Sequence, residues 1–315
     1  MHTASAVCMF YLEFELGREK MSKKVADVKD SVYETHSAVA QWEEENRNIT
    51  KTIPHTMLTI GKRRALFLLG GHDLEMLTIR EILSSQGYDF IDKHLTWSNS
   101  KLSCYQGEMA RFWKDVPDGI VCGIELENDL AIAAENYLPI DHHNELANRQ
   151  SALEQVLELL DLPLTRTYRL IAANDRRYIP GMVEAGATDE EVREIRFADR
   201  RAQGVTDEDE RLAEQSVADH LERRGNLLVV RALGRRFSPI CDRLYPYGSL
   251  LVYNAVEWTF YGRGAAAVKE LLADEIRKGR VYSGGGKDGY VGGKSGQFTE
   301  SEIENTIEKI KNANL

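Results

Sequence analysis

The first half of the chain alternates short apolar runs with helical patterns. Residues 65–69 are continuously apolar and stop at Gly70-Gly71, which predicts a strand followed by a tight turn. Apolar residues from Leu74 to Leu83 then recur at helical spacing. Further apolar runs predict three more strands, at 88–91, 119–124 and 137–140. Strands that alternate with helices in this way predict a parallel sheet.

A charged stretch follows this region. Residues 151–160 carry a helical apolar face, and residues 167–173 can form either a helix or a strand that delivers Asn174 and Asp175. Residues 187–225 are strongly charged and have only weak helical faces, interrupted by Gly204. We therefore expect a helical connector whose charges face solvent.

The sequence pattern changes again after Gly225, where short apolar runs replace the charged stretch. We expect a smaller mixed domain with strands at 227–230, 250–253 and 258–261, a helix at 265–276, a glycine-rich loop at 283–296 and a polar helix at 301–312. The whole chain is then an α/β protein of four segments. These are a polar N-terminal extension, helical or loose, at 1–60, a parallel-sheet domain at 61–186, the helical connector at 187–225 and the mixed domain at 226–315.

Composition and net charge limit the classes of partner that the chain is expected to bind. The chain has 315 residues and a formal net charge of -10. A long nucleic acid needs Lys and Arg to neutralise its phosphates, so this charge favours a small substrate. Residues 4–16 lack the basic start of a secretory signal, and no apolar run approaches the roughly 18 residues that span a bilayer. We therefore expect no membrane association and a cytoplasmic location.

Four acidic or histidine-containing clusters follow apolar runs: His72-Asp73-Leu74-Glu75, Glu125-Leu126-Glu127, Asp141-His142-His143 and Asn174-Asp175. In open α/β sheets, functional groups gather at the carboxyl ends of the strands. Carboxylate and imidazole donors suit Mn²⁺ or Mg²⁺, and two such ions can clamp a phosphoryl group and activate water. The clusters therefore predict a metal-dependent hydrolase, although Asp73 and Asp175 could each serve simply as a helix cap or turn residue.

Several of these motifs together resemble a known family. The segments that carry the likeness are 139–143, the serine-led helix that begins at Ser151-Ala152, and 171–178 with Asp175. They are similar to the motifs of the DHH phosphoesterases. The stretch from Gly284 to Gly293 is similar to the glycine-rich loop of the DHH-associated C-terminal domain, which in that family faces the cleft and helps to hold the substrate. The resemblance covers roughly residues 64–296 and leaves the N-terminal extension unmatched.

The resemblance implies roles for individual residues. Metal ligands would be Asp73, Glu75, Glu125 (or Glu127 in its place), Asp141, His142 and Asp175. Asp141 and His143 would be catalytic, with His143 binding metal or touching the scissile phosphate. Substrate would be held by Gly284, Gly285, Gly286 and Lys287, with Lys294 as an alternative to Lys287. Arg176 and Arg177 follow the metal-site residue Asp175 and could bind a phosphate, but each could equally form a surface salt bridge. The implied cofactor is Mn²⁺, with Mg²⁺ or Co²⁺ as substitutes.

The chain also departs from the family pattern. Gly71 stands where the first motif has histidine, and His72 is one residue out of register. Glutamate replaces the second-motif aspartate, and the glycine-rich loop has lysine in place of the usual histidine.

Three functions are consistent with this pattern. The first is a phosphoesterase or phosphodiesterase that uses metal-activated water to hydrolyse a small nucleotide, a short oligonucleotide or polyphosphate. The second is a non-catalytic or regulatory protein that binds a nucleotide or metal on a degenerate DHH scaffold. The third is a single-strand exonuclease of the RecJ type, which would need a basic, aromatic-lined track that the acidic composition does not favour. A homodimer is one expectation for the assembly.

Overall fold

A computed structural model describes residues 64–130, 132, 136–285 and 288–313. The expected N-terminal extension at 1–60 lies outside the described residues, as do Gly286 and Lys287.

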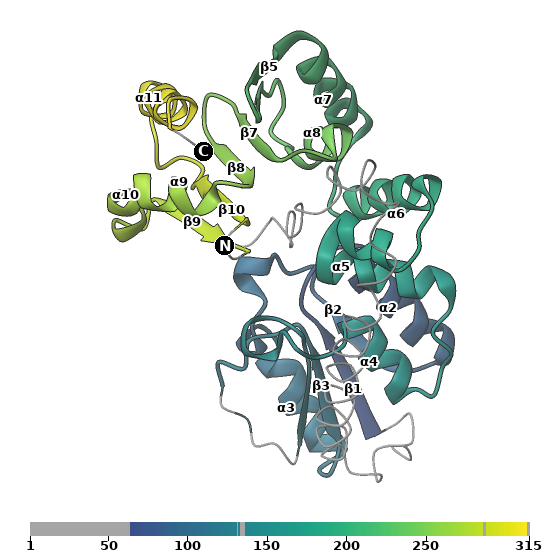
Figure 1. Ribbon diagram of the computed structural model, residues 1–315. Coiled ribbons are helices and arrows are strands. Elements are labelled where there is room, and N and C mark those ends of the chain that lie inside the picture. Colours follow the sequence, from purple (N-terminus) through teal and green to yellow (C-terminus); the bar gives the residue numbers. More distant parts are fainter. Residues whose placement is uncertain (1–63, 131, 133–135, 286–287, 314–315) are drawn as a thin grey trace, which may run out of the picture.

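The first sheet has four parallel strands in the order β2-β1-β3-β4. Figure 1 labels β1, β2 and β3 of this sheet, next to α2 and α4. They are β1 (Ala65–Leu69), β2 (Asp89–Asp92), β3 (Ile120–Ile124) and β4 (Tyr137–Ile140). All four were expected from the apolar runs. Because the strands are parallel, their carboxyl ends meet at one edge of the sheet.

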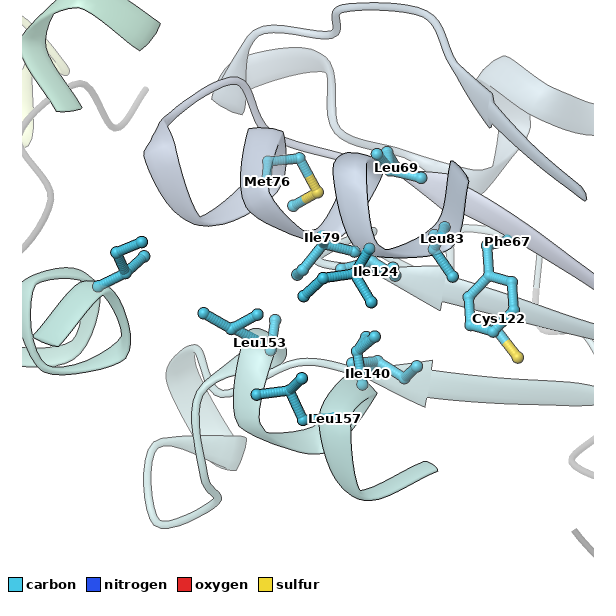
Figure 2. Packing of buried hydrophobic residues seen from close by; sticks show 14 of the residues in the cluster. Phe67, Leu69, Met76, Ile79, Leu83, Cys122, Ile124, Ile140, Leu153 and Leu157 are labelled. Atoms are coloured by element: carbon cyan, nitrogen blue, oxygen red, sulfur yellow. The ribbon is translucent and has the colours of Figure 1, made fainter. Parts of the chain in front are cut away.

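Helices bury both faces of this sheet. Alternate side chains of β1 point to opposite faces, so Phe67 and Leu69 join one core cluster while Leu66 and Leu68 join another. The first cluster packs under α2 (Leu74–Gln86), α4 (Ala152–Leu159) and α5 (Arg166–Glu184). Figure 2 shows side chains of α2 and α4 meeting those of the strands. The second cluster packs against the short helix at Leu102–Tyr105 and α3 (Gln106–Asp115).

The charged region after α4 is more than a connector. Residues 167–173, left open as helix or strand, are helical within α5. They are followed by α6 (Asp189–Ala202) and α7 (Asp207–His220). The expectation of a helix to residue 225 was wrong at its end, because Leu221–Arg224 form strand β5 and pair with β6. The expectation that the charged side chains face solvent was also wrong for Arg196, Asp199 and Arg200, which are buried.

The second sheet is mixed and has six strands in the order β5-β6-β7-β8-β10-β9. It adds β6 (Leu227–Arg231), β7 (Ser249–Tyr253), β8 (Trp258–Gly262), β9 (Val281–Gly284) and β10 (Tyr290–Gly293). Only the pairing of β6 with β7 is parallel among the described strands of this sheet. Apolar side chains of α9 (Ala265–Leu271) and α11 (Glu300–Lys311) cover one face, and those of α7 and α8 (Ser238–Leu244) cover the other. The expected α/β architecture with a smaller mixed second part is confirmed.

Two expectations for this second part need correction. The helix expected at 265–276 is divided into α9 and a short α10 (Ala273–Arg277). The loop expected at 283–296 is in part strand, because residues 283–284 end β9 and residues 290–293 form β10, which pairs with it. A Cβ on Gly292 would lie 2.3 Å from the Tyr282 ring, and one on Gly293 would lie 2.4 Å from Trp258 Nε1. These glycines therefore leave room for aromatic side chains on neighbouring strands.

The domain limits expected from the sequence stay predictions. Within the described residues, no helix is long and apolar enough to cross a membrane.

Candidate metal centre and cleft

Four buried side chains converge at the carboxyl edge of the first sheet. Glu75 lies in the first turn of α2 after β1, Glu125 follows β3, His142 follows β4 and Asp175 lies on α5. Each offers one ligand atom, and these four atoms lie within 4.8 Å of one another. We refer to Glu75, Glu125, His142 and Asp175 as the carboxylate cluster.

The imidazole of His142 lies at the middle of the carboxylate cluster. Its Nε2 atom is 2.7 Å from Asp175 Oδ2, 3.3 Å from Glu125 Oε1 and 3.8 Å from Glu75 Oε2. One imidazole therefore faces three carboxylates.

Local structure fixes two of these carboxylates. Oε1 of Glu75 accepts a hydrogen bond of 3.0 Å from the backbone N–H of Leu153 at the start of α4, so that Oε2 is the oxygen that faces His142. Glu125 has φ of +52°, in the left-handed region that side chains other than glycine rarely adopt. The chain turns sharply there beside Gly70, where a Cβ would lie 2.2 Å from the Glu125 carbonyl oxygen. Strained backbone of this kind is frequent at functional sites.

One imidazole faces three carboxylates, so the carboxylate cluster would keep a net negative charge if all three carboxylates were ionised. Burial raises the pKa of Glu75 and Glu125 well above its usual value, and the nearby carboxylate of Asp175 adds to the effect. Within the described part of the chain, neither oxygen of Glu125 nor Oε2 of Glu75 has a hydrogen-bond donor of ordinary geometry. Buried carboxylates without partners are costly, and a divalent cation would supply the missing charge. The residues therefore fit the cation that the sequence motifs imply.

In the absence of a cation, the surroundings of His142 favour its protonated form. Burial opposes its charged form, but the hydrogen bond to Asp175 and the charges of Asp175 and Glu75 raise its pKa to about 9. A cation that replaces this proton would take over the same neutralising role.

Asp141 and His143 lie at the exposed side of the carboxylate cluster. Oδ1 of Asp141 accepts hydrogen bonds of 2.8 Å from the backbone N–H and 2.9 Å from Nδ1 of His143. Burial alone would raise the pKa of Asp141, but these hydrogen bonds lower it. His143 is exposed and also places a ligand atom within 4.8 Å of atoms of Glu125 and His142. Asp141 therefore orients His143 at the opening of the cluster.

Asp73 is buried beside the carboxylate cluster and caps α2. Its Oδ1 accepts a hydrogen bond of 2.9 Å from Met76 N, which is the capping role that the sequence left open. Burial, then Asp175, raises the pKa of Asp73 well above its usual value. Glu127, the alternative to Glu125, is instead exposed and pairs with Lys101 at 3.1 Å. Of the two glutamates, the structure brings only Glu125 to the cluster.

The substrate-binding candidates are spread out. Arg177 forms an ion pair with Glu184, and Arg176 lies 3.9 Å from Glu154. Gly284 ends β9, and Gly285, with φ of +71°, follows it. Neither glycine lines the cleft described below.

A cleft of about 600 Å³ lies beside the carboxylate cluster. One wall comes from the first sheet's side, including His72, His94, Trp97 and Asn174. The other comes from the second sheet and its helices, including Arg235, Arg236, Thr259, Tyr261 and Tyr282. Trp97 in this wall lies 5.7 Å from His143 between ring centroids, and His143 lies 4.5 Å from His142, so the cleft is near the carboxylate cluster. Its volume is typical of a site for a small molecule.

Sequence reasoning missed most of this cleft. Arg235 and Arg236 are exposed, and neither has a carboxylate partner within 4 Å among the described residues, although most arginines of that part of the chain do. An adjacent pair of arginines in an acidic chain was an available signal. Trp97 also packs against Gly71, where a Cβ would lie 2.4 Å from the indole ring. The position at which the DHH pattern has histidine is thus covered by tryptophan.

A buried ionic network joins the two walls. Asp242 on α8 accepts hydrogen bonds from the Tyr178 hydroxyl, Arg196 and Arg200. Arg196 also binds Asn174 at 2.9 Å, next to the carboxylate cluster. Tyr178 lies at a break in α5 with φ of +55°, just before Pro180. The network therefore ties the second part of the chain to the element that carries Asp175.

Comparisons with known proteins give matches in structure only. No family model and no curated protein matches the sequence. One similar solved structure is described as the DHH domain of a member of a family of ribosomal proteins. It shares 11% identity over 88% of this chain and 92% of that chain, with a TM-score of 0.45.

Two further matches are described as enzymes. A pGpG-specific phosphodiesterase from Vibrio cholerae is 14% identical over 79% of this chain and 97% of its own, with a TM-score of 0.40. RecJ from Thermus thermophilus, in complex with Mg²⁺, is 12% identical over 81% of this chain and 51% of its own, with a TM-score of 0.39. A DHH-domain protein is thus among the matches. At these identities and TM-scores the matches carry no argument about activity or substrate.

Proposed function

We propose that the chain is a divalent-metal-dependent phosphoesterase of the DHH type that hydrolyses a small nucleotide or a short oligonucleotide. The observation that carries the proposal is the carboxylate cluster, in which three buried carboxylates meet one imidazole within 4.8 Å. A protein tolerates such a concentration of buried negative charge when a cation is to be bound. Mn²⁺ accepts both carboxylate and imidazole donors, so it is the cofactor we propose.

Different residues of the chain would bind the cation, contact the phosphate and hold the metal ligands in place. Glu75, Glu125, His142 and Asp175 would hold the cation, which supplies Lewis acidity toward a phosphoryl oxygen and lowers the pKa of water. Asp141 accepts the hydrogen bond from His143 Nδ1 at 2.9 Å, which leaves the other ring nitrogen of His143 for the cation or a phosphate oxygen. Asp73, bound to the start of α2, would keep Glu75 in place.

The cleft supports a nucleotide as the substrate. Arg235 and Arg236 offer two guanidinium groups that have no carboxylate partner within 4 Å in the described part of the chain, and such groups suit phosphate oxygens. Trp97, Tyr261 and Tyr282 give the same cleft aromatic surface on which a base could stack. Arg176 and Arg177 stay candidates for phosphate contacts, although both already have glutamate partners. A polyphosphate would use the arginines but not the aromatic rings.

A substrate panel tests this proposal. Purified protein is assayed with Mn²⁺, Mg²⁺ and Co²⁺ on linear dinucleotides, cyclic dinucleotides, polyphosphate and short single strands. Glu125→Gln is the test variant, and Glu127→Gln is its matched control, since both change the same type of residue two positions apart. We expect dinucleotide hydrolysis that Glu125→Gln reduces by at least about 10²-fold and Glu127→Gln leaves unchanged. Equal activity of the two variants would contradict the proposal.

One observation favours a second function, the non-catalytic binding of a nucleotide or metal. Trp97 covers Gly71, so no ligand comes from the position where the DHH pattern has histidine. Metal binding without turnover of any substrate in the panel would support this second function. Preference for long single strands over dinucleotides would instead support an exonuclease of the RecJ type. A cytoplasmic location and a homodimer stay predictions.

A further inference from the structure

Two histidines and an aspartate gather outside the carboxylate cluster, on the β2 side of the cleft. His72 follows β1, Asp92 ends β2 and His94 lies two residues further on. Each offers a ligand atom, and the three atoms lie within 4.8 Å of one another. The two imidazole rings are 5.1 Å apart between centroids and nearly perpendicular, at 89°. These residues share no member with the carboxylate cluster.

The backbone is shaped to bring the rings together. His94 has φ of +51°, and its backbone N–H donates a hydrogen bond of 2.7 Å to Asp92 Oδ1. Histidine adopts this left-handed conformation more often than most residues other than glycine. The turn places His94 Nδ1 3.4 Å from Asp92 Oδ2, which also lies 3.5 Å from Arg80 Nη1. The hydrogen bond and the turn together hold His94 next to Asp92.

Two features distinguish the group from an ordinary ion pair. Nδ1 of His72 is buried and has no hydrogen-bond partner among the described residues. The Asp92 side chain is only 6% exposed, while His94 reaches solvent at 59%. A buried nitrogen without a hydrogen-bond partner needs an explanation, and together with a buried carboxylate it can donate electron pairs to a metal cation.

The donor chemistry differs from that of the carboxylate cluster. Two imidazoles and one carboxylate suit Zn²⁺ and other borderline cations, whereas a carboxylate-rich set suits Mn²⁺ or Mg²⁺. Three protein ligands leave a tetrahedral cation one open position. Both His72 and His94 line the cleft, so that position would be reached from the cleft.

We propose that His72, Asp92 and His94 form a second cation site, selective for Zn²⁺, with its open position facing the cleft. The site stands independently of the proposed phosphoesterase function. If a phosphorylated substrate occupies the cleft, the cation would bind an anionic group of that substrate.

The test is Co²⁺ and Zn²⁺ binding to the metal-free full-length chain. Co²⁺ bound by imidazole in low coordination has intense visible absorption, and Zn²⁺ competes for the same ligands. The background is Glu125→Gln, which weakens the carboxylate cluster and leaves all three ligands of the second site intact. In that background we compare His72→Gln, His94→Asn and a control, His220→Asn, on an exposed residue at the end of α7. Asn tolerates the left-handed backbone at position 94.

We expect one equivalent of Co²⁺ with a low-coordination spectrum that Zn²⁺ displaces, in both the Glu125→Gln background and the His220→Asn control. His94→Asn and His72→Gln should weaken Zn²⁺ binding by about tenfold or more, because only two strong ligands remain. The proposal is overturned if these two variants keep the spectrum and Zn²⁺ affinity of the control. It is equally overturned if the background protein binds no Zn²⁺, in which case Asp92 and His94 form only a local ion pair.

Discussion

Nε2 of His142 lies 2.7 Å from Oδ2 of Asp175, so the end of β4 and the middle of α5 meet inside the carboxylate cluster. Burial opposes a proton on His142, but Asp175 and the neighbouring carboxylates raise its pKa to about 9. Burial also raises the pKa of Glu75 and Glu125 well above 4.5. All three groups therefore bind protons more tightly in the folded, metal-free protein than in the unfolded chain.

This linkage predicts how stability depends on pH. A group whose pKa is raised on folding stabilises the fold at low pH, and that contribution is lost as pH rises. For His142 the loss runs from its unfolded value of 6.5 up to about 9. Thermal unfolding with a chelator should therefore give a Tm that falls between pH 6.5 and 9. Glu125→Gln should have a flatter profile than Glu127→Gln.

With saturating Mn²⁺, the Tm should rise with pH over the range in which the Tm of the metal-free protein falls. The cation needs deprotonated ligands, so its stabilising effect grows as pH rises. A metal-free Tm that instead increases over this range, to the same extent in Glu125→Gln, would contradict the assignment of His142 as the buried imidazolium.

The Asp242 network predicts a large loss of stability from one substitution. Asp242 is 9% exposed and receives hydrogen bonds from two buried arginines, Arg196 and Arg200. Asp242→Ala leaves both guanidinium groups without this carboxylate, so the free energy of unfolding should fall by about 3–5 kcal/mol in urea titrations. Asp207→Ala is the control, because Asp207 is 95% exposed where it pairs with Arg201, and such pairs contribute about 1 kcal/mol or less. Equal losses in the two variants would contradict a structural role for the network.

The cleft arginines predict a change in substrate affinity. Arg235→Ala and Arg236→Ala each remove a guanidinium group from the wall opposite Trp97. If each contacts a phosphate that does not react, KM should rise about tenfold while kcat changes little. Arg211→Ala is the control, since Arg211 pairs with Glu208 on the exposed face of α7. If KM is unchanged in both cleft variants but rises in Arg177→Ala, the phosphate is bound by α5 and not by the cleft arginines.

The sequence predicted the first sheet well, together with the polar residues that follow its strands. Apolar runs such as 65–69 and 119–124 are short, clearly bounded and followed by polar residues, and parallel strands bring those residues to one edge. The choice between Glu125 and Glu127 could not be made in this way. It depends on the left-handed backbone at Glu125, which turns that side chain inward and leaves Glu127 in solvent.

Other parts of the site depend on contacts between distant segments. Arg196, Asp199 and Arg200 were expected to face solvent because the surrounding run is highly charged. Their helical spacing, three and four residues apart, puts them on one face of α6, and that face is buried. Their burial follows from the packing of Asp242, which lies more than 40 residues away along the chain. No local pattern shows that contact.

Part of the glycine-rich segment serves strand packing, which the motif did not predict. Gly292 and Gly293 lie in β10 and accommodate Tyr282 and Trp258. Glycine content alone does not distinguish close packing of strands from close approach to an anion.

The most direct test of the central claim is Mn²⁺ binding by the carboxylate cluster. Metal-free protein is titrated with Mn²⁺ at pH 8, and free Mn²⁺ is followed by electron paramagnetic resonance. We predict at least one tightly bound Mn²⁺ per chain in the unsubstituted protein and in Glu127→Gln. Glu125→Gln and His142→Ala should each lose that ion. Fewer than one Mn²⁺ per chain in the unsubstituted protein, or equal binding by Glu125→Gln and Glu127→Gln, would contradict the claim.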